Sequence, residues 1–317
     1  MMPGSSAGAD LESRLTIILK SCLTEDITIK HFKQIDEGKG YMSSVYSAEL
    51  GKDNGHSTQK VVIKIPTSEK IIAETAEMDL PPDYDVVLED MVQTVHNTEV
   101  GIYQFIAGIP ESIPSPFLVS GAFRSSQCEG FLVLEDWTEK GLLPNFATGL
   151  NYNQTIQLME AVAAIQAAGV INNQWQNVVK PVKREVFAEI ALSLDLYHDF
   201  FLKEFPDVYK VEREILVPLY NTDVLMAIFN PSPETKNTVL VHGDLWTNNM
   251  FFKKDLSTGE ASNELLGLID WQMAHIGRPA EDIVRLLTTS VQTDVRTKHT
   301  QDFLKHFYKT LSGLLNS

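Results

Sequence analysis

Short apolar runs separated by polar turns fill much of the first half of the chain, a pattern typical of β-strands. They predict strands over 27–35, 45–50, 60–65, 117–123 and 130–134. A connecting segment that contains Gly38, Gly40, Ser43 and Ser44 joins the first two of these runs. The pattern therefore predicts a small sheet in the first half of the chain.

Apolar residues recur at helical spacing in other segments, most of which lie in the second half of the chain. They predict helices over 11–23, 91–106, 154–168, 185–204, 209–230, 280–291 and 300–315, and the helix over 209–230 is expected to be interrupted at Pro218. Residues 1–10 are small and polar and are expected to be disordered. The acidic segment 79–90 contains two prolines and is expected to be a loop, because proline disrupts a helix interior. Together the patterns predict an α+β protein.

Charged and amide side chains follow an apolar run in the stretch 241–250, which reads Val-His-Gly-Asp-Leu-Trp-Thr-Asn-Asn-Met. A second apolar run, 265–269, ends on Asp270. Asp244, Asn249 and Asp270 are therefore expected at the ends of neighbouring strands. Two carboxylates and one amide suit phosphoryl transfer, in which one carboxylate takes the proton of the attacking hydroxyl and the other groups hold magnesium.

Protein kinases arrange the same groups as H-R-D-L-x-x-x-N followed by D-F-G. In this chain Gly243 replaces the arginine, and Asp270-Trp271-Gln272 replaces D-F-G. An A-P-E element is also missing from the sequence. We therefore expect a kinase-like fold without an activation-loop switch, and a protein kinase is the weakest of the functions considered.

The motif His242-Gly243-Asp244 with Asn249, and the motif 269–272, resemble those of the aminoglycoside phosphotransferase and choline kinase superfamily. Within it, three further segments are most similar to the CHK-kinase-like, or ecdysteroid-kinase-like, group: 132–136, 246–249, and 277–279 followed by Asp282. The resemblance covers roughly residues 30–290. It implies a protein-kinase-like two-lobe fold with a small antiparallel-sheet N-lobe and a mainly helical C-lobe.

The resemblance also implies roles for individual residues. Asp244 would be the general base, and Asn249 and Asp270 would bind Mg²⁺. Lys64, on the third predicted strand, would clamp the ATP phosphates and pair with Glu99. The other expected nucleotide-site residues are Gly38, Gly40, Ser43 and Ser44 in the first loop, and Glu135 and Trp137 at the link between the lobes.

Each of these assignments has a simpler alternative. A strand lysine usually points to solvent, a helix glutamate usually lies on the surface, and Glu89 is a second choice as the partner of Lys64. Asp282 would either hold the catalytic loop in place or simply be an acid at a helix N-terminus. His275 has no companion metal ligands in the sequence and is expected to be structural.

Three parts are predicted along the chain. Residues 1–26 form an N-terminal extension with a short helix, 27–137 a nucleotide-binding N-lobe, and 138–317 a helical C-lobe with the catalytic loop. The resembled family continues with further helices, so this C-lobe is expected to be short at its C-terminal end. The family also places a histidine near Gln166, where this chain has an amide.

The formal net charge of −16 argues against nucleic acid as a partner, because phosphates would be repelled. It favours a cationic acceptor weakly; a solvated acidic surface explains it more simply. Cys22 and Cys128 suggest neither a disulfide framework nor a zinc site. Without a signal peptide or a membrane-span pattern, a cytoplasmic protein is expected, with no obligate protein partner.

These observations predict an ATP- and magnesium-dependent small-molecule kinase. Its acceptor would be a small alcohol, steroid-like or choline-like. The alternative is a catalytically inactive nucleotide-binding or interaction domain of the same fold, which the short C-terminus and the missing histidine favour. The presence of Asp244, Asn249 and Asp270 argues for the enzyme.

Overall fold

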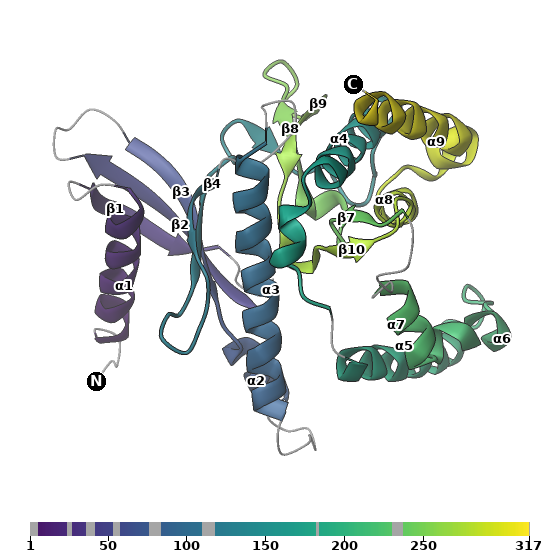
Figure 1. Ribbon diagram of the computed structural model, residues 1–317, viewed down its shortest axis with the longest axis horizontal. Helices are drawn as coiled ribbons and strands as arrows, with labels where there is room; N and C mark the ends of the chain where they lie inside the picture. Colours follow the sequence, from purple (N-terminus) through teal and green to yellow (C-terminus); the bar gives the residue numbers. More distant parts are fainter. Residues whose placement is uncertain are drawn as a thin grey trace.

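The computed structural model describes residues 6–23, 27–35, 42–52, 58–75, 84–109, 118–181, 184–229 and 237–316. The first part is built on an antiparallel five-stranded sheet, ordered β1-β2-β3-β5-β4 (Figure 1). Its strands are β1 (Ile27–Gln34), β2 (Ser43–Lys52), β3 (Thr58–Pro66), β4 (Leu118–Ala122) and β5 (Phe131–Glu135). The small antiparallel sheet that the sequence predicts is confirmed.

Helices cover both faces of this sheet, with α1 (Ser6–Cys22) on one side and α3 (Tyr84–Ala107) on the other (Figure 1). Successive strand residues point to opposite faces. Accordingly, Leu132 packs in the core beside α3, whereas Val133 packs in the core beside α1, and both are fully buried. A short helix, α2 (Glu69–Thr75), follows β3.

Two expectations for this part were wrong. Residues 6–10 are helical, because α1 begins at Ser6 rather than at 11. Helix α3 begins at Tyr84, so most of the predicted loop 79–90 is helix. The prolines at 81 and 82 lie outside the described residues and precede the helix, where proline does not interrupt the helix interior.

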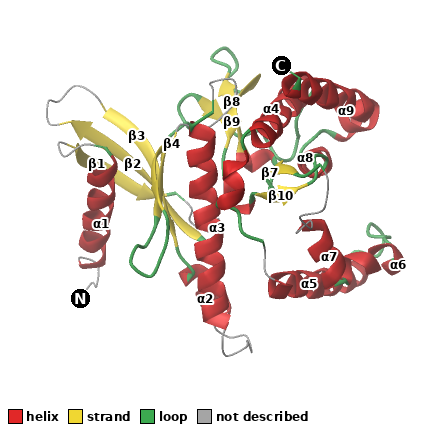
Figure 2. Ribbon diagram, in the orientation of Figure 1, coloured by secondary structure: helices red, strands yellow, loops and turns green. Residues whose placement is uncertain are grey.

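The second part combines helices with short strands, as the secondary-structure colours in Figure 2 show. Helix α4 (Tyr152–Ile171), which begins with an Asn151 capping box, packs along α9 (Thr293–Leu315). One small sheet contains β6 (Gly141–Leu142), β8 (Met250–Lys254) and β9 (Ala261–Leu268), and another contains β7 (Val239–Val241) and β10 (His275–Gly277). The remaining elements here are α8 (Glu281–Thr289) and the 3₁₀ segments Asn173–Asn177, Thr247–Asn249 and Trp271–Met273.

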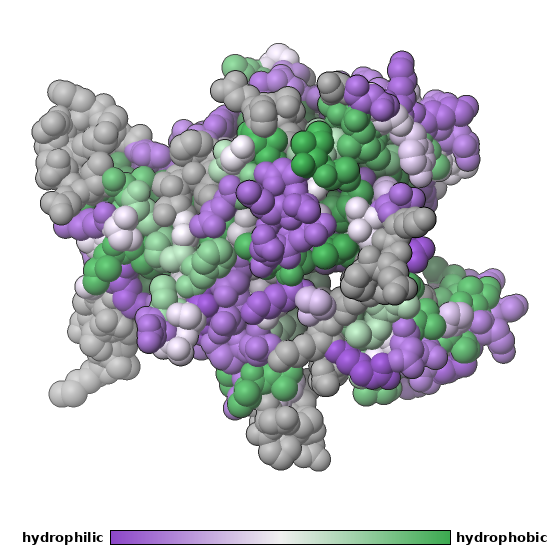
Figure 3. Space-filling model, viewed as in Figure 1, coloured by the Kyte–Doolittle hydropathy of each residue, from purple (hydrophilic) through white to green (hydrophobic). Residues whose placement is uncertain are grey.

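Helix α5 (Arg184–Glu204) and the segments after it lie apart from α4 and α9 (Figure 1). The helix predicted over 209–230 is interrupted at Pro218, as expected: the chain forms α6 (Arg213–Leu216), a 3₁₀ turn (Val217–Tyr220) and α7 (Thr222–Phe229). Pro218 lies in the first positions of the 3₁₀ turn, because a proline cannot continue the hydrogen-bond ladder of a helix. Figure 3 shows apolar side chains at the surface of this group. Its exposed apolar residues include Phe200, Phe201 and Val208.

The fold class is therefore α+β with a protein-kinase-like arrangement of a sheet-containing part and a mainly helical part. The predicted boundaries at 26/27 and 137/138 stay predictions. None of the helices in the described ranges is both long enough and apolar enough to cross a membrane.

Candidate active site

The loop that contains Asp244 begins with a sharp turn at Gly243, directly after β7. Gly243 has a φ of 81°, in the left-handed region that favours glycine. A Cβ at this position would also lie 2.2 Å from the carbonyl oxygen of Met273. Glycine is therefore required here by both backbone conformation and space, which gives a physical reason for its presence where protein kinases have arginine.

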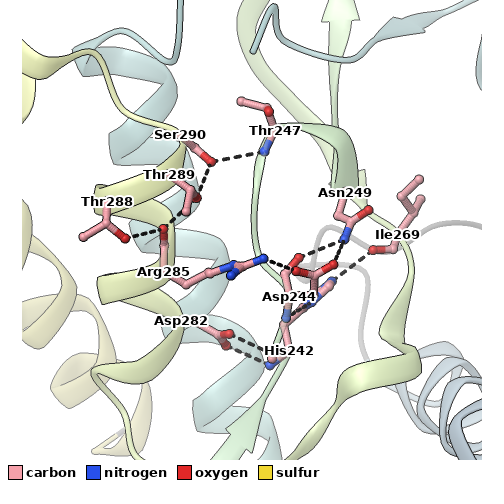
Figure 4. A network of polar contacts seen from close by, with 11 residues as sticks. His242, Asp244, Thr247, Asn249, Ile269, Asp282, Arg285, Thr288, Thr289 and Ser290 are labelled. Carbon is pink, nitrogen blue, oxygen red and sulfur yellow. Dashed lines mark hydrogen bonds and ion pairs between the residues drawn. The ribbon is translucent and has the colours of Figure 1, made fainter. Parts of the chain in front are cut away.

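Helix α8 holds the start of the loop through the buried carboxylate of Asp282 (Figure 4). The carboxylate accepts hydrogen bonds from the backbone N–H groups of His242 at 2.8 Å and of Gly243 at 3.0 Å. Burial raises the pKa of Asp282, and these two hydrogen bonds oppose that rise because they favour the charged form. The prediction that Asp282 holds the catalytic loop in place is confirmed.

His242 connects this loop to the segment that carries Asp270. Its Nδ1 accepts from the N–H of Asp244 at 3.3 Å, so its Nε2 is the atom that donates to the carbonyl of Ile269, at 3.0 Å. The ring also lies against the buried ring of Trp271, with a centroid distance of 4.4 Å. The two predicted catalytic segments are thus fixed relative to each other by one side chain.

Asn249 and Asp244 face each other across the loop (Figure 4). The Nδ2 group of Asn249 donates to the carbonyl oxygen of Asp244 at 2.8 Å and to its Oδ2 at 3.0 Å. Both N–H bonds of the amide are used in this way. The Oδ1 of Asn249 is consequently the atom that could ligate a metal ion.

Arg285, on α8, also contacts Asp244, and the sequence reasoning did not identify it. Its Nη2 donates to Oδ1 of Asp244 at 2.5 Å, opposite the oxygen that Asn249 bonds. Its only sequence signal is its position three residues after Asp282, which places both side chains on the same face of α8.

Lys64, Glu99 and Asp270 form one ion cluster between the sheet and the second part of the chain. The Nζ of Lys64 lies 2.7 Å from Oε2 of Glu99 and 2.8 Å from Oδ1 of Asp270. Asp270 has a φ of 66°, an uncommon conformation for a non-glycine residue that recurs at functional sites. Its N–H donates to the hydroxyl oxygen of Tyr103 at 3.1 Å, a contact that the sequence reasoning missed.

The electrostatics of this cluster follow from its burial. Burial alone would lower the pKa of Lys64, but Asp270 and Glu99 outweigh it and raise the pKa well above its usual value. Burial raises the pKa of Glu99 to about 7, against the opposing effect of the lysine and with a further rise from Asp270. Two carboxylates therefore share one ammonium, and the pKa of Glu99 is raised because its charged form is cut off from water.

Glu99 is thus the partner of Lys64, as predicted, and the second choice Glu89 is not. Glu89 instead forms an ion pair with Arg124, whose Nε lies 2.8 Å from Oε1 of the glutamate. The position of Glu99 on α3 explains the difference: it lies four residues before Tyr103, so both face the segment around Asp270.

The other predicted nucleotide-site residues are less closely connected to these groups. Ser43 and Ser44 begin β2, next to Val45, which pairs with Lys64. Glu135 ends β5 and accepts hydrogen bonds from Nε1 of Trp137 at 2.9 Å and from Lys140 at 2.7 Å. Gly38 and Gly40 lie outside the described residues.

The side chains of His275 and Gln166 bond neighbouring protein groups, which fits a structural role. Both ring nitrogens of His275 face acceptors, the carbonyl of Met273 and the carboxylate of Glu281. Burial opposes its protonation, but Glu281 raises the pKa of His275 overall. Gln166 is buried and donates to the carbonyl of Pro279. Across the described ranges there is no group of three or more His, Cys, Asp or Glu side chains arranged to hold a metal ion.

Two proteins of Caenorhabditis elegans and several solved structures are similar to this chain. It is 25% identical to an uncharacterised kinase-like protein of Caenorhabditis elegans over 96% of this chain and 78% of that protein. It is 22% identical to an uncharacterised oxidoreductase of the same organism over 86% of this chain, which spans 34% of that longer protein. Among solved structures, the GDP and kanamycin complex of an aminoglycoside phosphotransferase, APH(2″)-IIIa, is similar, with a TM-score of 0.51 and 16% identity over 95% of this chain and 88% of that one.

The GDP complex of wild-type aminoglycoside 2′-phosphotransferase-IIIa gives a TM-score of 0.50 at 15% identity, over 96% of this chain and 88% of that one. At such identities the likeness concerns the fold, and it agrees with the kinase-like arrangement described above. The family model of the ecdysteroid kinase-like family matches residues 37–317, which include all the groups of the candidate site. The chain therefore belongs to the ecdysteroid kinase-like family.

Proposed function

We propose that this protein is an ATP- and magnesium-dependent kinase that transfers the γ-phosphate of ATP to a hydroxyl group of a small molecule. The observation that carries the proposal is the convergence of Lys64, Glu99 and Asp270 on one point, although Lys64 and Asp270 are 206 positions apart in the sequence. Asp244 and Asn249 are tied to the same place through His242, which bonds both loops.

In the proposed reaction, the carboxylate of Asp244 accepts the proton of the attacking hydroxyl as the hydroxyl oxygen bonds to the γ-phosphorus. The bond between the γ-phosphorus and the bridging oxygen of ATP breaks in the same step, and ADP leaves with that oxygen. Lys64, kept charged by two carboxylates, binds the phosphates and holds them in line. Residues around the site position the reactants, so catalysis rests on geometry and charge rather than on a covalent enzyme intermediate.

The residues present fit a magnesium ion. Mg²⁺ is typically held by one or two protein oxygens together with phosphates and water. Asp270 supplies a carboxylate, and Asn249 supplies an amide oxygen because both of its N–H bonds are directed at Asp244. When bound, the ion would neutralise phosphate charge during transfer.

The family name makes steroid-like alcohols the first acceptors to test, and choline-like alcohols the second. A cytoplasmic location is part of the proposal. It is supported by Cys22 and Cys128, which are both free thiols.

The proposal is tested by measuring ADP release from magnesium–ATP in the presence of a panel of alcohols. We expect Asp244→Asn to lower turnover by about 10²–10⁴-fold while it keeps the stabilisation of the folded chain by magnesium–ATP. Asp270→Asn should lose that magnesium-dependent stabilisation. Asp255→Asn is the matched control, because Asp255 lies in the β8–β9 turn and bonds only nearby residues such as Ser257. Unchanged turnover in Asp244→Asn would contradict the assigned base.

A second candidate is a nucleotide-binding domain without transferase activity. It is favoured by the contact of Arg285 with Oδ1 of Asp244, which occupies one oxygen of the proposed base. Stabilisation by magnesium–ATP without phosphate transfer to any alcohol in the panel would support this candidate over the kinase.

A further inference from the structure

Three side chains hold the catalytic loop along its length (Figure 4). Two of them lie on α8, and the third belongs to the residue that follows α8. Asp282 bonds the backbone of residues 242 and 243, Arg285 bonds the side chain of Asp244, and Ser290 Oγ accepts from the N–H of Thr247 at 3.1 Å. Of these three, Arg285 alone contacts the reactive carboxylate. Any effect of α8 on the chemistry of Asp244 therefore passes most directly through this arginine.

Arg285 differs from the other two in its exposure. Asp282 and Ser290 are buried, whereas 47% of the Arg285 side chain and 26% of the Asp244 side chain are exposed. An acceptor hydroxyl has to reach Asp244 through the exposed part of its carboxylate. The guanidinium that lies against that carboxylate is open to solvent as well, so it borders the space that an acceptor would enter.

The carboxylates around the loop are all matched by cations or donors. Asp270 contacts Lys64, Glu281 contacts His275, Asp282 accepts two backbone N–H groups, and Asp244 contacts Arg285. Asp244, the carboxylate that an acceptor hydroxyl would reach, is therefore paired with a cation. A positively charged acceptor would meet an Asp244 whose charge Arg285 already offsets.

We propose that Arg285 is a positioning residue for Asp244 and that it discriminates against acceptors carrying a positive charge close to the reacting hydroxyl. The proposal rests on the kinase function proposed above. A hydroxyl that donates to Asp244 lies about 3 Å from it. A cationic group a few bonds farther along the acceptor would then be near the guanidinium as well, and like charges repel.

A purely structural ion pair is the competing explanation. Exposed ion pairs contribute little to folding stability, so Arg285 variants should fold. A structural role would also leave the relative use of charged and uncharged acceptors unchanged. Acceptor selectivity therefore separates the two explanations more cleanly than overall activity does.

The test uses choline and its uncharged carbon isostere, in which a tert-butyl group replaces the trimethylammonium. For each compound, kcat/KM is measured with magnesium–ATP in wild type, Arg285→Gln and Arg285→Lys. We expect Arg285→Gln to shift the ratio of the two values about tenfold toward choline and to lower kcat for the uncharged compound. Arg285→Lys should keep the wild-type ratio because it keeps the charge.

Arg296→Gln is the matched control. Arg296 bonds the carbonyl oxygens of Leu287 and Thr288 at the end of α8, so its loss removes the same charge and loosens the same helix without a contact to Asp244. It should leave the ratio unchanged. If wild type phosphorylates neither compound, the ratio is taken from their dissociation constants in the presence of magnesium–ATP.

An Arg285→Gln ratio equal to that of wild type would overturn the proposal, as would an equal shift in Arg296→Gln. Failure of the kinase function itself has a separate signature, because wild type would then transfer phosphate to no alcohol of the panel, whether or not magnesium–ATP stabilises it. A selectivity shift confined to Arg285→Gln supports both the position of Asp244 as the base and the role of the arginine.

Discussion

The proposed nucleotide side and the proposed acceptor side of the site use the same kind of ion pair in different environments. On the nucleotide side, Lys64 and Glu99 have only 13% and 2% of their side chains exposed. On the acceptor side, Arg285 and Asp244 have 47% and 26% exposed. Removing one partner of a buried pair leaves an uncompensated charge and costs much stability, whereas an exposed pair contributes little.

The difference teaches that the two sides are held in place by different means. The nucleotide side depends on its charges, which are supported by Tyr103 one turn farther along α3. The acceptor side is held by backbone hydrogen bonds to Asp282 and Ser290, so the side chain of Asp244 can change partners without disturbing the loop. Substitutions on the nucleotide side should therefore change mainly the stability of the fold, and substitutions on the acceptor side should change mainly the catalytic activity.

The largest effect is expected for Lys64→Met. The substitution leaves Glu99 buried without its cation, which should lower the free energy of unfolding by about 3–5 kcal/mol at pH 8. The loss should be smaller at pH 5, because the pKa of Glu99 is raised to about 7 and the group is then protonated. Urea unfolding at both pH values measures this difference.

Lys60→Met provides the control for that experiment, since Lys60 lies on the same strand in an exposed pair with Glu139. It should leave the free energy of unfolding almost unchanged, because an exposed pair contributes little. Equal losses in the two variants would remove the contrast between buried and exposed pairs.

The next largest effect is a loss of folding stability at low pH that depends on His96, which also lies on α3. Burial lowers the pKa of His96 to about 4, and its Nε2 lies 2.9 Å from the carbonyl of Ala122. The pKa of His96 is lower in the folded state than in the unfolded state. The contribution of the neutral ring to the free energy of unfolding is therefore complete above about pH 6.5 and is lost as the pH falls toward 4. Wild type should lose about 3 kcal/mol over that interval relative to His96→Gln. Parallel stability curves for the two proteins would show that His96 is not responsible. The half-buried His299, exposed over 38% of its side chain, provides the control variant His299→Gln.

Asp282→Ala should have an intermediate effect and sharpens the comparison from the acceptor side. It leaves the N–H groups of His242 and Gly243 without their acceptor, which should cost about 2 kcal/mol of unfolding free energy and most of the activity. Asp282→Asn keeps one acceptor oxygen and should cost less. Thermal unfolding and activity assays of the two variants provide the measurement. An alanine variant as stable as wild type would show that the conformation of the loop does not depend on Asp282.

The smallest stability effects are expected for Asp244→Asn and Arg285→Gln. Each breaks only a partly exposed pair, so the free energy of unfolding should change by less than about 1 kcal/mol. Equilibrium unfolding in urea tests this. A loss as large as that of Lys64→Met would mean that the acceptor side also depends on its charges.

The site residues that the sequence predicted are those that belong to a local pattern along the chain. Lys64 among apolar strand residues, Glu99 in a helical pattern and the loop around Asp244 are local signals, and the structure brings them together. Arg285 was missed because its contact with Asp244 spans 41 positions and depends on how α8 is oriented. Tyr103 was missed because its ring reads as an apolar contact, although its hydroxyl bonds Asp270.

The errors in the fold have similar causes. The two prolines before α3 suggested a loop, but proline disrupts only the helix that contains it, and α3 starts two residues later. Pro218, in contrast, does interrupt its predicted helix, because it lies inside the segment. A proline therefore marks a boundary in the sequence without showing on which side of it the helix lies.

The turn at Gly243 has a consequence for how this family and the protein kinases could have diverged. An arginine at 243 would need a left-handed backbone and would place its Cβ 2.2 Å from the Met273 carbonyl. A single substitution therefore does not convert the loop to the protein-kinase form, since the segment around Met273 has to move at the same time. The residue at 243 and the path of the segment around Met273 are therefore coupled by steric contact.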